Sequence, residues 1–225
     1  MQTGWQSVNN NWYYFANNGA AMNGWQRING RWYGFGGAND GAAYTGWHLI
    51  NNNWYYFNQD GEARTGWQTI NGHRYYFDPT NAWALKNWQV LNNSWYYFDN
   101  NNALALTGWQ WLGNNWYYFA PTNNAMLAGL QTINNNLYYL NDQHDGTYGA
   151  MKTGWQLVNG SWYYFNNSGS ALSSWQTING NRYYFDPTNH QMFTGVHLIN
   201  GDYYFFSPSG SQQKGLVYNL SLIHI

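Results

Sequence analysis

Residues 154–165 have the sequence GWQLVNGSWYYF, and variants of this stretch recur along nearly the whole chain. Its general form is Gly-Trp-Gln-x-Ile-Asn-Gly-x-Trp-Tyr-Tyr-Phe, followed by a linker of about 8–13 residues. Fourteen of the 16 Trp residues occupy the two Trp positions of this pattern. A repeat every 20–25 residues predicts an array of small supersecondary units, ten of them complete. The repeats start at Gly4, Gly24, Gly46, Gly66, Asn87, Gly108, Gly129, Gly154, Ser174, Gly195 and Gly215.

Each repeat is typical of a β-hairpin. Two runs of aromatic and β-branched residues flank a short polar turn, and Asn-Gly is the strongest local hairpin signal. Asn-Gly stands at residues 159–160 and at the same place in four other repeats, while further repeats have Asn-rich turns. No helical period is present, and the linkers are rich in Gly, Asn, Pro and Ser. The sequence therefore predicts an all-β fold of about ten hairpins.

A two-residue turn also determines which side chains share a face. Directly opposed residues of an antiparallel pair lie on the same face, and faces alternate along each strand. The two Trp positions and the second Tyr then share one face, whereas the aliphatic position, the first Tyr and the Phe share the other. In the eighth repeat these sets are Trp155, Trp162 and Tyr164, and Val158, Tyr163 and Phe165. We expect the second set to form the core and the first to lie at the joints between repeats.

A lone hairpin is marginally stable in water, so the repeats are expected to stack in series as a β-solenoid. The pattern favours one repeat domain over residues 1–217, and no second domain is evident. The apolar tail at 218–225 fits no position of the repeat and stays unassigned. Because the chain starts and stops within the pattern, we expect it to be part of a longer protein whose other activities lie elsewhere.

The composition excludes several classes of function. Charged residues make up only 8% of the chain, against about 25% in typical soluble proteins, while aromatic residues reach 22%. With eight Lys and Arg and a net charge of −1, the chain is unsuited to nucleic acid. No apolar run approaches the roughly 18–20 residues of a membrane span, so membrane insertion is not expected. The absence of Cys excludes disulfides, thiol catalysis and Cys-ligated metals.

Catalytic residues are not expected either. Glycoside hydrolysis needs two facing carboxylates, and the one close pair, Asp142 and Asp145, lies in a polar linker where such residues are ordinary. His48 and His197 stand where Gln usually stands, so they are interpreted as variants of the repeat. No nucleophile elbow, phosphate-binding glycine loop or His-Glu-x-x-His motif is present. The sequence predicts no enzyme, no metal site and no cofactor in these residues.

The surplus of Trp and Tyr favours a ligand. Packing alone would bury about 150–250 Å² per ring, and Leu, Ile and Val would serve as well. Aromatic cages bind quaternary ammonium groups through cation–π contacts of about 0.5–2 kcal/mol each. Sugar rings, which lie flat on aromatic side chains, are the other ligand class that this composition suits.

Residues 4–25, GWQSVNNNWYYFANNGAAMNGW, resemble the choline-binding, or cell-wall-binding, repeat of Gram-positive surface proteins and cell-wall hydrolases. The resemblance covers residues 3–217. It implies a left-handed superhelix of hairpins, with cages that use two Trp of one hairpin, an aromatic residue of the next and often a Met or Leu. It also implies a secreted, cell-wall-associated or extracellular module that binds choline on teichoic acids and anchors a larger protein.

Carried over by position, the resemblance implies five cages. They would consist of Trp25, Trp32 and Tyr56; Trp47, Trp54 and Tyr76; Trp88, Trp95 and Tyr118; Trp109, Trp116, Tyr139 and Met126; and Trp155, Trp162 and Tyr184. Trp5 and Trp12 form a weaker one, because the second repeat has Gly34 in place of the second Tyr. Which Tyr of each pair points inward depends on the turn register.

A glycan ligand stays open as the alternative. Residues 69–78, TINGHRYYFD, also resemble the glucan-binding repeats of glucansucrases and the receptor-binding repeats of large clostridial toxins, which lack the Trp pair. Four repeats depart from the pair, with Arg74, with Arg182, with Leu130 and Leu137, and with Val196 and Tyr203. A cation in a choline cage would repel the ligand, so the Arg repeats are expected to be spacers or sugar contacts.

Overall fold

The computed structural model describes residues 2–37 and 40–214, and its regular elements there are twenty strands of five residues each. The start of an eleventh hairpin at Gly215 and the tail at 218–225 lie outside the described residues. Within the described ranges there is no helix long and apolar enough to cross a membrane. The strands are β1 (Gly4–Val8), β2 (Asn11–Phe15), β3 (Gly24–Ile28), β4 (Arg31–Phe35), β5 (Gly46–Ile50), β6 (Asn53–Phe57), β7 (Gly66–Ile70), β8 (His73–Phe77), β9 (Asn87–Leu91), β10 (Ser94–Phe98), β11 (Gly108–Leu112), β12 (Asn115–Phe119), β13 (Gly129–Ile133), β14 (Asn136–Leu140), β15 (Gly154–Val158), β16 (Ser161–Phe165), β17 (Ser174–Ile178), β18 (Asn181–Phe185), β19 (Gly195–Ile199) and β20 (Asp202–Phe206).

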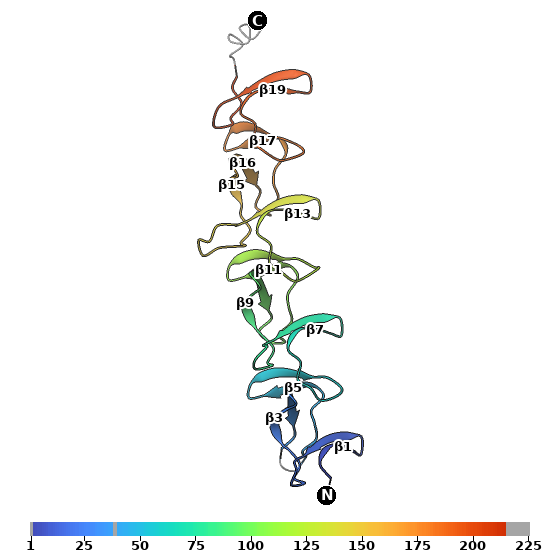
Figure 1. The fold of residues 1–225 in the computed structure, drawn as a ribbon. Coiled ribbons are helices and arrows are strands. Elements are labelled where there is room, and N and C mark those ends of the chain that lie inside the picture. The colour runs from blue at the N-terminus through green and yellow to red at the C-terminus, as the bar shows by residue number, and fades with distance from the viewer. Residues whose placement is uncertain (1, 38–39, 215–225) are drawn as a thin grey trace. The chain divides into compact units, whose positions relative to one another are not determined.

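Consecutive strands pair into ten separate two-stranded sheets, which confirms the prediction of an all-β chain of ten hairpins (Figure 1). In β15–β16, Trp155 lies opposite Tyr164 and Val158 opposite Ser161. The turn between them has φ of 50° at Asn159 and 80° at Gly160, the two positive values that a type I′ turn needs. The expected two-residue turn and register are therefore confirmed.

The two faces of a hairpin differ in burial as expected, most clearly in β15–β16. In β15–β16, Val158, Tyr163 and Phe165 are 4%, 4% and 1% exposed, whereas Trp162 on the other face is 42% exposed. The Phe that ends the second strand is almost inaccessible in eight hairpins. These residues are Phe35, Phe57, Phe77, Phe98, Phe119, Phe165, Phe185 and Phe206. The aliphatic and Phe face is therefore the core.

Contacts group the chain into two compact units. The first contains Met1–Gly108 and Phe119–Met126, and the second contains Trp109–Tyr118 and the chain from Leu127 onward. The same packing joins successive hairpins inside each unit. The first Trp of one hairpin lies against the first Tyr of the next, as Trp47 does against Tyr75 at 4.9 Å between ring centroids. The Trp face of a hairpin thus meets the core face of its successor.

The linkers tie each hairpin to the one before it. After β17–β18, the amide of Phe193 donates to the carbonyl of Tyr184 in the same hairpin, at 2.9 Å. The preceding residue, Met192, donates instead to the carbonyl of Trp162 in the previous hairpin, at 2.8 Å. In the first unit, Ala84 makes the same bond to Trp54. Each linker therefore lies along the second strand of the preceding repeat.

The histidines at the Gln position have the role that the sequence predicts. Gln68 donates from Nε2 to the carbonyl of Thr65 at 2.8 Å. His48 makes the same contact with Thr45 at 3.0 Å, and its ring stacks on Tyr44 at 4.1 Å. The interpretation of His48 as a variant of the repeat is confirmed.

Candidate ligand-binding sites

The two Trp positions of a hairpin form a corner. The ring centroids of Trp155 and Trp162 are 6.3 Å apart and the rings are nearly perpendicular, at 84°. The register causes this, since Trp155 opposes Tyr164 and Trp162 opposes Leu157, which puts both indoles on one face. Trp155 is half-buried against the next hairpin, while Trp162 stands at the surface.

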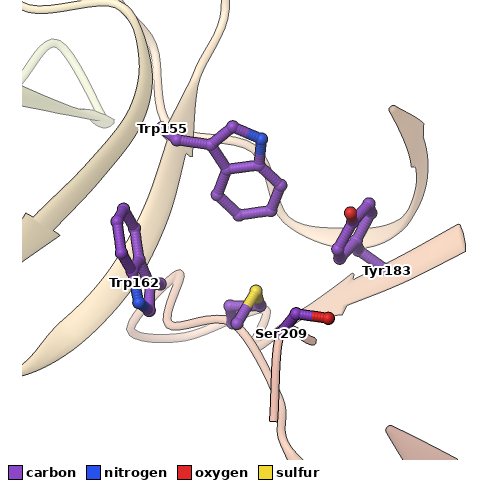
Figure 2. Close-up of a pocket in the computed structure, with 5 residues that line it drawn as sticks. Trp155, Trp162, Tyr183 and Ser209 are labelled. Atoms are coloured by element: carbon purple, nitrogen blue, oxygen red, sulfur yellow. The ribbon is translucent and has the colours of Figure 1, made fainter. Parts of the chain in front are cut away.

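The following repeats close this corner into a pocket of about 440 Å³. Tyr183 of β18 and Met192 of the next linker line it, together with Ser209, which lies one repeat further on. In Figure 2, Trp155, Trp162, Tyr183 and Ser209 surround a common space. All five lining residues are uncharged, so the pocket offers aromatic faces, a thioether and hydroxyl groups.

The same arrangement recurs at β11–β12. Trp109 and Trp116 line a pocket of about 390 Å³ with Tyr138 of the next hairpin and Met151 of its linker. Asn167 and Ser168, from the linker one repeat later, complete the lining. Each pocket is therefore built from three consecutive repeats, of which the first supplies the Trp pair.

Four more hairpins carry the perpendicular Trp pair, with interplanar angles between 81° and 88°. The centroid distances are 6.4 Å for Trp5 and Trp12, 6.1 Å for Trp25 and Trp32, 6.1 Å for Trp47 and Trp54, and 6.0 Å for Trp88 and Trp95. With Trp155 and Trp162, five of the six Trp pairs thus meet as perpendicular corners, and Trp109 and Trp116 line one pocket.

The third aromatic residue is the first Tyr of the next hairpin, not the second. Trp155 lies 4.9 Å from Tyr183, whereas Tyr184 lies 5.1 Å from Trp175 of its own hairpin. The expectation that the second Tyr of the next hairpin lies against the Trp pair is therefore wrong. The reason is the direction of stacking: a hairpin presents its core face to the preceding Trp pair, and the first Tyr lies on that face.

The other expected second tyrosines follow the same rule. Tyr56 lies 5.3 Å from Trp47, Tyr76 5.3 Å from Trp67, and Tyr118 5.1 Å from Trp109, in each case within one hairpin. Tyr139 instead donates its hydroxyl to Asp142 and stacks near Phe165. The first tyrosines lie where the second tyrosines were expected. Tyr55 is 4.7 Å from Trp25, Tyr75 is 4.9 Å from Trp47, and Tyr138 is 4.9 Å from Trp109.

The expectation for the first repeat changes for the same reason. Gly34 lacks the second Tyr, but Trp5 lies 4.9 Å from Tyr33, the first Tyr of that hairpin. A Cβ at Gly34 would come within 2.8 Å of Tyr44 and Phe57, so the linker Tyr44 fills the space left by the missing side chain. The substitution at Gly34 therefore gives no geometric reason for a weaker site at Trp5.

The methionine position was also misassigned from sequence. Met126 was expected beside Trp109 and Trp116, but its amide binds the carbonyl of Trp95 at 2.8 Å. Met151 lines the pocket of Trp109 instead. Each linker lies along the preceding hairpin. A linker residue therefore lines the pocket of the Trp pair in the repeat before its own.

Two of the tyrosines that contact Trp pairs are buried enough to favour the neutral phenol. Burial raises the pKa of Tyr55 and the pKa of Tyr75 above the ordinary value for tyrosine. Both phenols therefore stay protonated at neutral pH. A cation bound next to them would meet neutral aromatic rings rather than a paired negative charge.

The hairpin β13–β14 has leucines in place of the pair and a different pocket. Leu130 and Leu137 contribute to a pocket of about 460 Å³. The rest of its lining is mostly polar and comes from the same hairpin and from the linker after β17–β18. These residues are Thr132, Asn135, Pro187, Thr188, Asn189 and His190.

The close carboxylate pair, Asp142 and Asp145, is hydrogen-bonded within its own loop. Tyr139 donates its hydroxyl to Asp142 at 2.7 Å, and this bond holds the pKa of Asp142 below its usual value. Asp145 accepts hydrogen bonds from Asn141 and Thr147, each at 2.8 Å. Across the described ranges, no three His, Asp or Glu side chains come together as metal ligands would. These residues organise the loop.

Comparison with known proteins identifies the repeats. Six overlapping segments match the family model described as choline-binding repeat. These are residues 2–45, 44–87, 64–105, 85–129, 127–173 and 152–195. The chain belongs to the choline-binding repeat family. No curated protein matches the chain.

Solved structures of Streptococcus pneumoniae proteins share the fold. Choline binding protein F is 26% identical, with a TM-score of 0.69 over 94% of this chain and 86% of its own. CbpJ is also 26% identical, with a TM-score of 0.64 over 93% of this chain and 94% of its own. The modular autolysin LytC, at 22% identity and a TM-score of 0.53, matches 95% of this chain with 53% of its own length and shares the fold alone.

Proposed function

We infer that each Trp pair, closed by the following repeats, binds one choline group, and that the ligand in the cell wall is the choline of teichoic acid. The observation that carries this proposal is the pocket of Trp155 and Trp162, with Tyr183 and Met192 as further walls. It recurs at β11–β12 with the same residue types in the same positions. A site repeated along the chain suits a ligand that is repeated along a polymer.

The chemistry of these walls fits a quaternary ammonium better than a primary amine. A trimethylammonium group has no N–H to donate, and its charge is spread over methyl groups that pack against rings. Aromatic faces attract such a cation without a carboxylate, by about 0.5–2 kcal/mol per contact. The five residues lining the β15–β16 pocket include three aromatic rings and no acid. Ser209 lines the same pocket and supplies a hydroxyl group, which suits the hydroxyl group of choline.

The family supports a role at the cell wall. Choline binding protein F, a relative by fold and sequence, has been solved in the presence of a peptidoglycan analogue and in complex with ipratropium. By analogy, the present chain serves as a non-catalytic module that holds a secreted protein at a Gram-positive cell surface. Weak single sites suffice for this role, because multivalent binding exceeds single-site affinity by about 10²–10⁴.

The proposal includes the architecture that the sequence suggests. Residues 1–217 form one repeat domain, and its hairpins follow a left-handed β-solenoid. Contacts between successive hairpins within each unit support this arrangement, since each Trp face covers the next core face. A solenoid of this kind presents its sites at regular intervals, which suits binding to a repetitive polymer.

A surface glycan or α-glucan is the second candidate, and the β13–β14 pocket favours it. Leu130 and Leu137 give this pocket an apolar wall without the faces that attract a cation. Asn135, Thr188 and Asn189 supply amide and hydroxyl groups that can bind sugar hydroxyls. In this alternative the chain resembles the glucan-binding repeats in function, or the glycan-binding repeats of clostridial toxins.

A titration followed by Trp fluorescence separates the two ligands. Choline should change the emission in the millimolar range expected for a few contacts of about 0.5–2 kcal/mol, and dextran should not. The variant Trp162→Ala should remove part of the choline response, whereas Leu137→Ala should leave it unchanged. A response to dextran with none to choline would reverse the order of the candidates. Incubation with murein and glucans should give no turnover, and reproducible hydrolysis would contradict a non-catalytic module.

A further inference from the structure

Two hairpins carry an arginine in the second Trp position, and both arginines lie on the first Trp. The guanidinium carbon of Arg74 is 4.2 Å from the ring centroid of Trp67. That of Arg182 is 4.0 Å from the ring centroid of Trp175. Both distances are well within the roughly 6 Å at which a cation and an aromatic face attract each other. Each of these hairpins thus has its own cation on its first Trp.

The aromatic neighbour of Trp67 and the path of the linker match those of a site with a Trp pair. Tyr96, the first Tyr of the next hairpin, lies 5.1 Å from Trp67, much as Tyr183 lies 4.9 Å from Trp155. The amide of Ala105 binds the carbonyl of Arg74 at 2.9 Å. This is the bond that Met192 makes to Trp162 in β15–β16. The stacking is the same, and two side chains differ: Arg74 stands in place of Trp162, and Ala105 in place of Met192.

A buried amide holds the guanidinium of Arg74 in place. Arg74 donates from Nη1 to Oδ1 of Asn124 at 3.0 Å. Asn124 is 4% exposed, and its Nδ2 donates to the carbonyls of Ala105 and Leu106 at 3.0 and 3.2 Å. Those two bonds fix the orientation of the amide, so its oxygen faces the arginine. Asn124 belongs to the linker two repeats after Arg74, as Ser209 does relative to Trp162.

We propose that Arg74 and Arg182 are built-in cations that occupy the ligand position of their hairpins and close these sites to quaternary ammonium groups. The proposal rests on the choline function proposed above. An incoming cation would have to displace the guanidinium from Trp67 and separate Arg74 from Asn124. It would also approach a fixed positive charge at close range, where two like charges repel each other. The two hairpins keep the aromatic stacking but bind no choline.

The change Arg74→Trp should convert a closed site into an open one. Six hairpins already tolerate Trp in this position, so the fold should accept the change. In the full chain labelled with ¹⁵N, choline should shift the indole N–H signal of Trp155 but not that of Trp67, which a Trp67→Phe spectrum assigns. In Arg74→Trp, choline should shift the Trp67 signal in the same concentration range, and one additional choline should bind per chain.

The matched control is Thr69→Trp, which keeps the arginine. Thr69 lies opposite Arg74 in the register, and Trp111 occupies the same position in β11. This variant adds an indole to the same face, and the Trp67 signal should stay unresponsive to choline. The proposal is overturned if Trp67 responds in the wild type or in Thr69→Trp. It is also overturned if Trp67 stays silent in a folded Arg74→Trp while Trp155 responds.

A measurement without choline separates this proposal from the choline function. The Trp67 ring should shift the side-chain protons of Arg74 upfield, and Trp67→Leu should return them to ordinary positions. If Trp155 and the other paired indoles ignore choline, the proposed function fails, and this shift alone decides whether the cation occupies the site. If the upfield shift is absent, the built-in cation is refuted whatever the paired indoles do.

Discussion

The hairpins β15–β16 and β7–β8 have the same construction and different sites. Both end in a Phe that is almost inaccessible, Phe165 at 1% and Phe77 at 0% exposure. In both, the first Trp lies against a Tyr of the next hairpin. They differ where Trp162 in one corresponds to Arg74 in the other. The comparison teaches that the contact between the first Trp and the Tyr of the next hairpin is kept whichever residue occupies the second Trp position, so this position is free to vary.

The largest expected effect should be equal in the two hairpins. Replacing a buried Phe with Ala typically costs about 3–5 kcal/mol of unfolding free energy. Phe165→Ala and Phe77→Ala should both cost this much, because both rings fill the same place in the core. Urea unfolding followed by circular dichroism measures the loss. A cost at Phe77 far below that at Phe165 would contradict the view that the two hairpins are built around equivalent core positions.

An intermediate effect should separate the two hairpins by function. Trp162→Ala should weaken choline binding at its own site by about 2–30-fold, the equivalent of one cation–π contact of about 0.5–2 kcal/mol, with little loss of stability. Arg74→Ala, the matched change in β7–β8, should not weaken choline binding. Isothermal titration with choline and retention on a choline resin measure both variants. Equal weakening by the two changes, with folding intact, would show that the site lies elsewhere on the hairpins.

The smallest expected effect tests which tyrosine completes the site. Tyr183→Leu removes the ring beside Trp155 and should lower choline affinity there by roughly 2–10-fold. Tyr184→Leu is the matched control, because Tyr184 lies on Trp175 of its own hairpin. The indole signal of Trp155 during a choline titration reports both. A larger effect at Tyr184 than at Tyr183 would restore the partner expected from sequence.

Local rules were sufficient to predict the hairpins. The Asn159-Gly160 turn sets the register, and strict alternation then assigns each side chain to a face, as the burial of Val158 and Phe165 confirms. The stacking of hairpins was not predictable in this way. Alternation says what lies on each face but not which face of the next hairpin will cover it. That choice depends on the linker, whose path is fixed by a backbone bond from Met192 to Trp162 that carries no side-chain signature.

The candidate site was accordingly predicted in part. The Trp pairs follow from the spacing within one repeat, and the structure brings them together. Tyr183, Met192 and Ser209 come from later repeats, and sequence reasoning missed all three. A periodic signal was present for one of them, since Met151 and Met192 stand at the same distance before the next repeat.

The pocket of Trp155 draws its walls from three consecutive repeats, with Ser209 belonging to the third. The unit of binding is therefore longer than the unit of folding. One hairpin carries the Trp corner but no site, two give a corner with one side missing, and three are the minimum for a complete pocket. In any array of this design, the complete sites therefore number at most two fewer than the repeats. Duplicating an internal repeat that carries the Trp pair then adds a whole site, whereas removing the last repeat opens the pocket two positions before it.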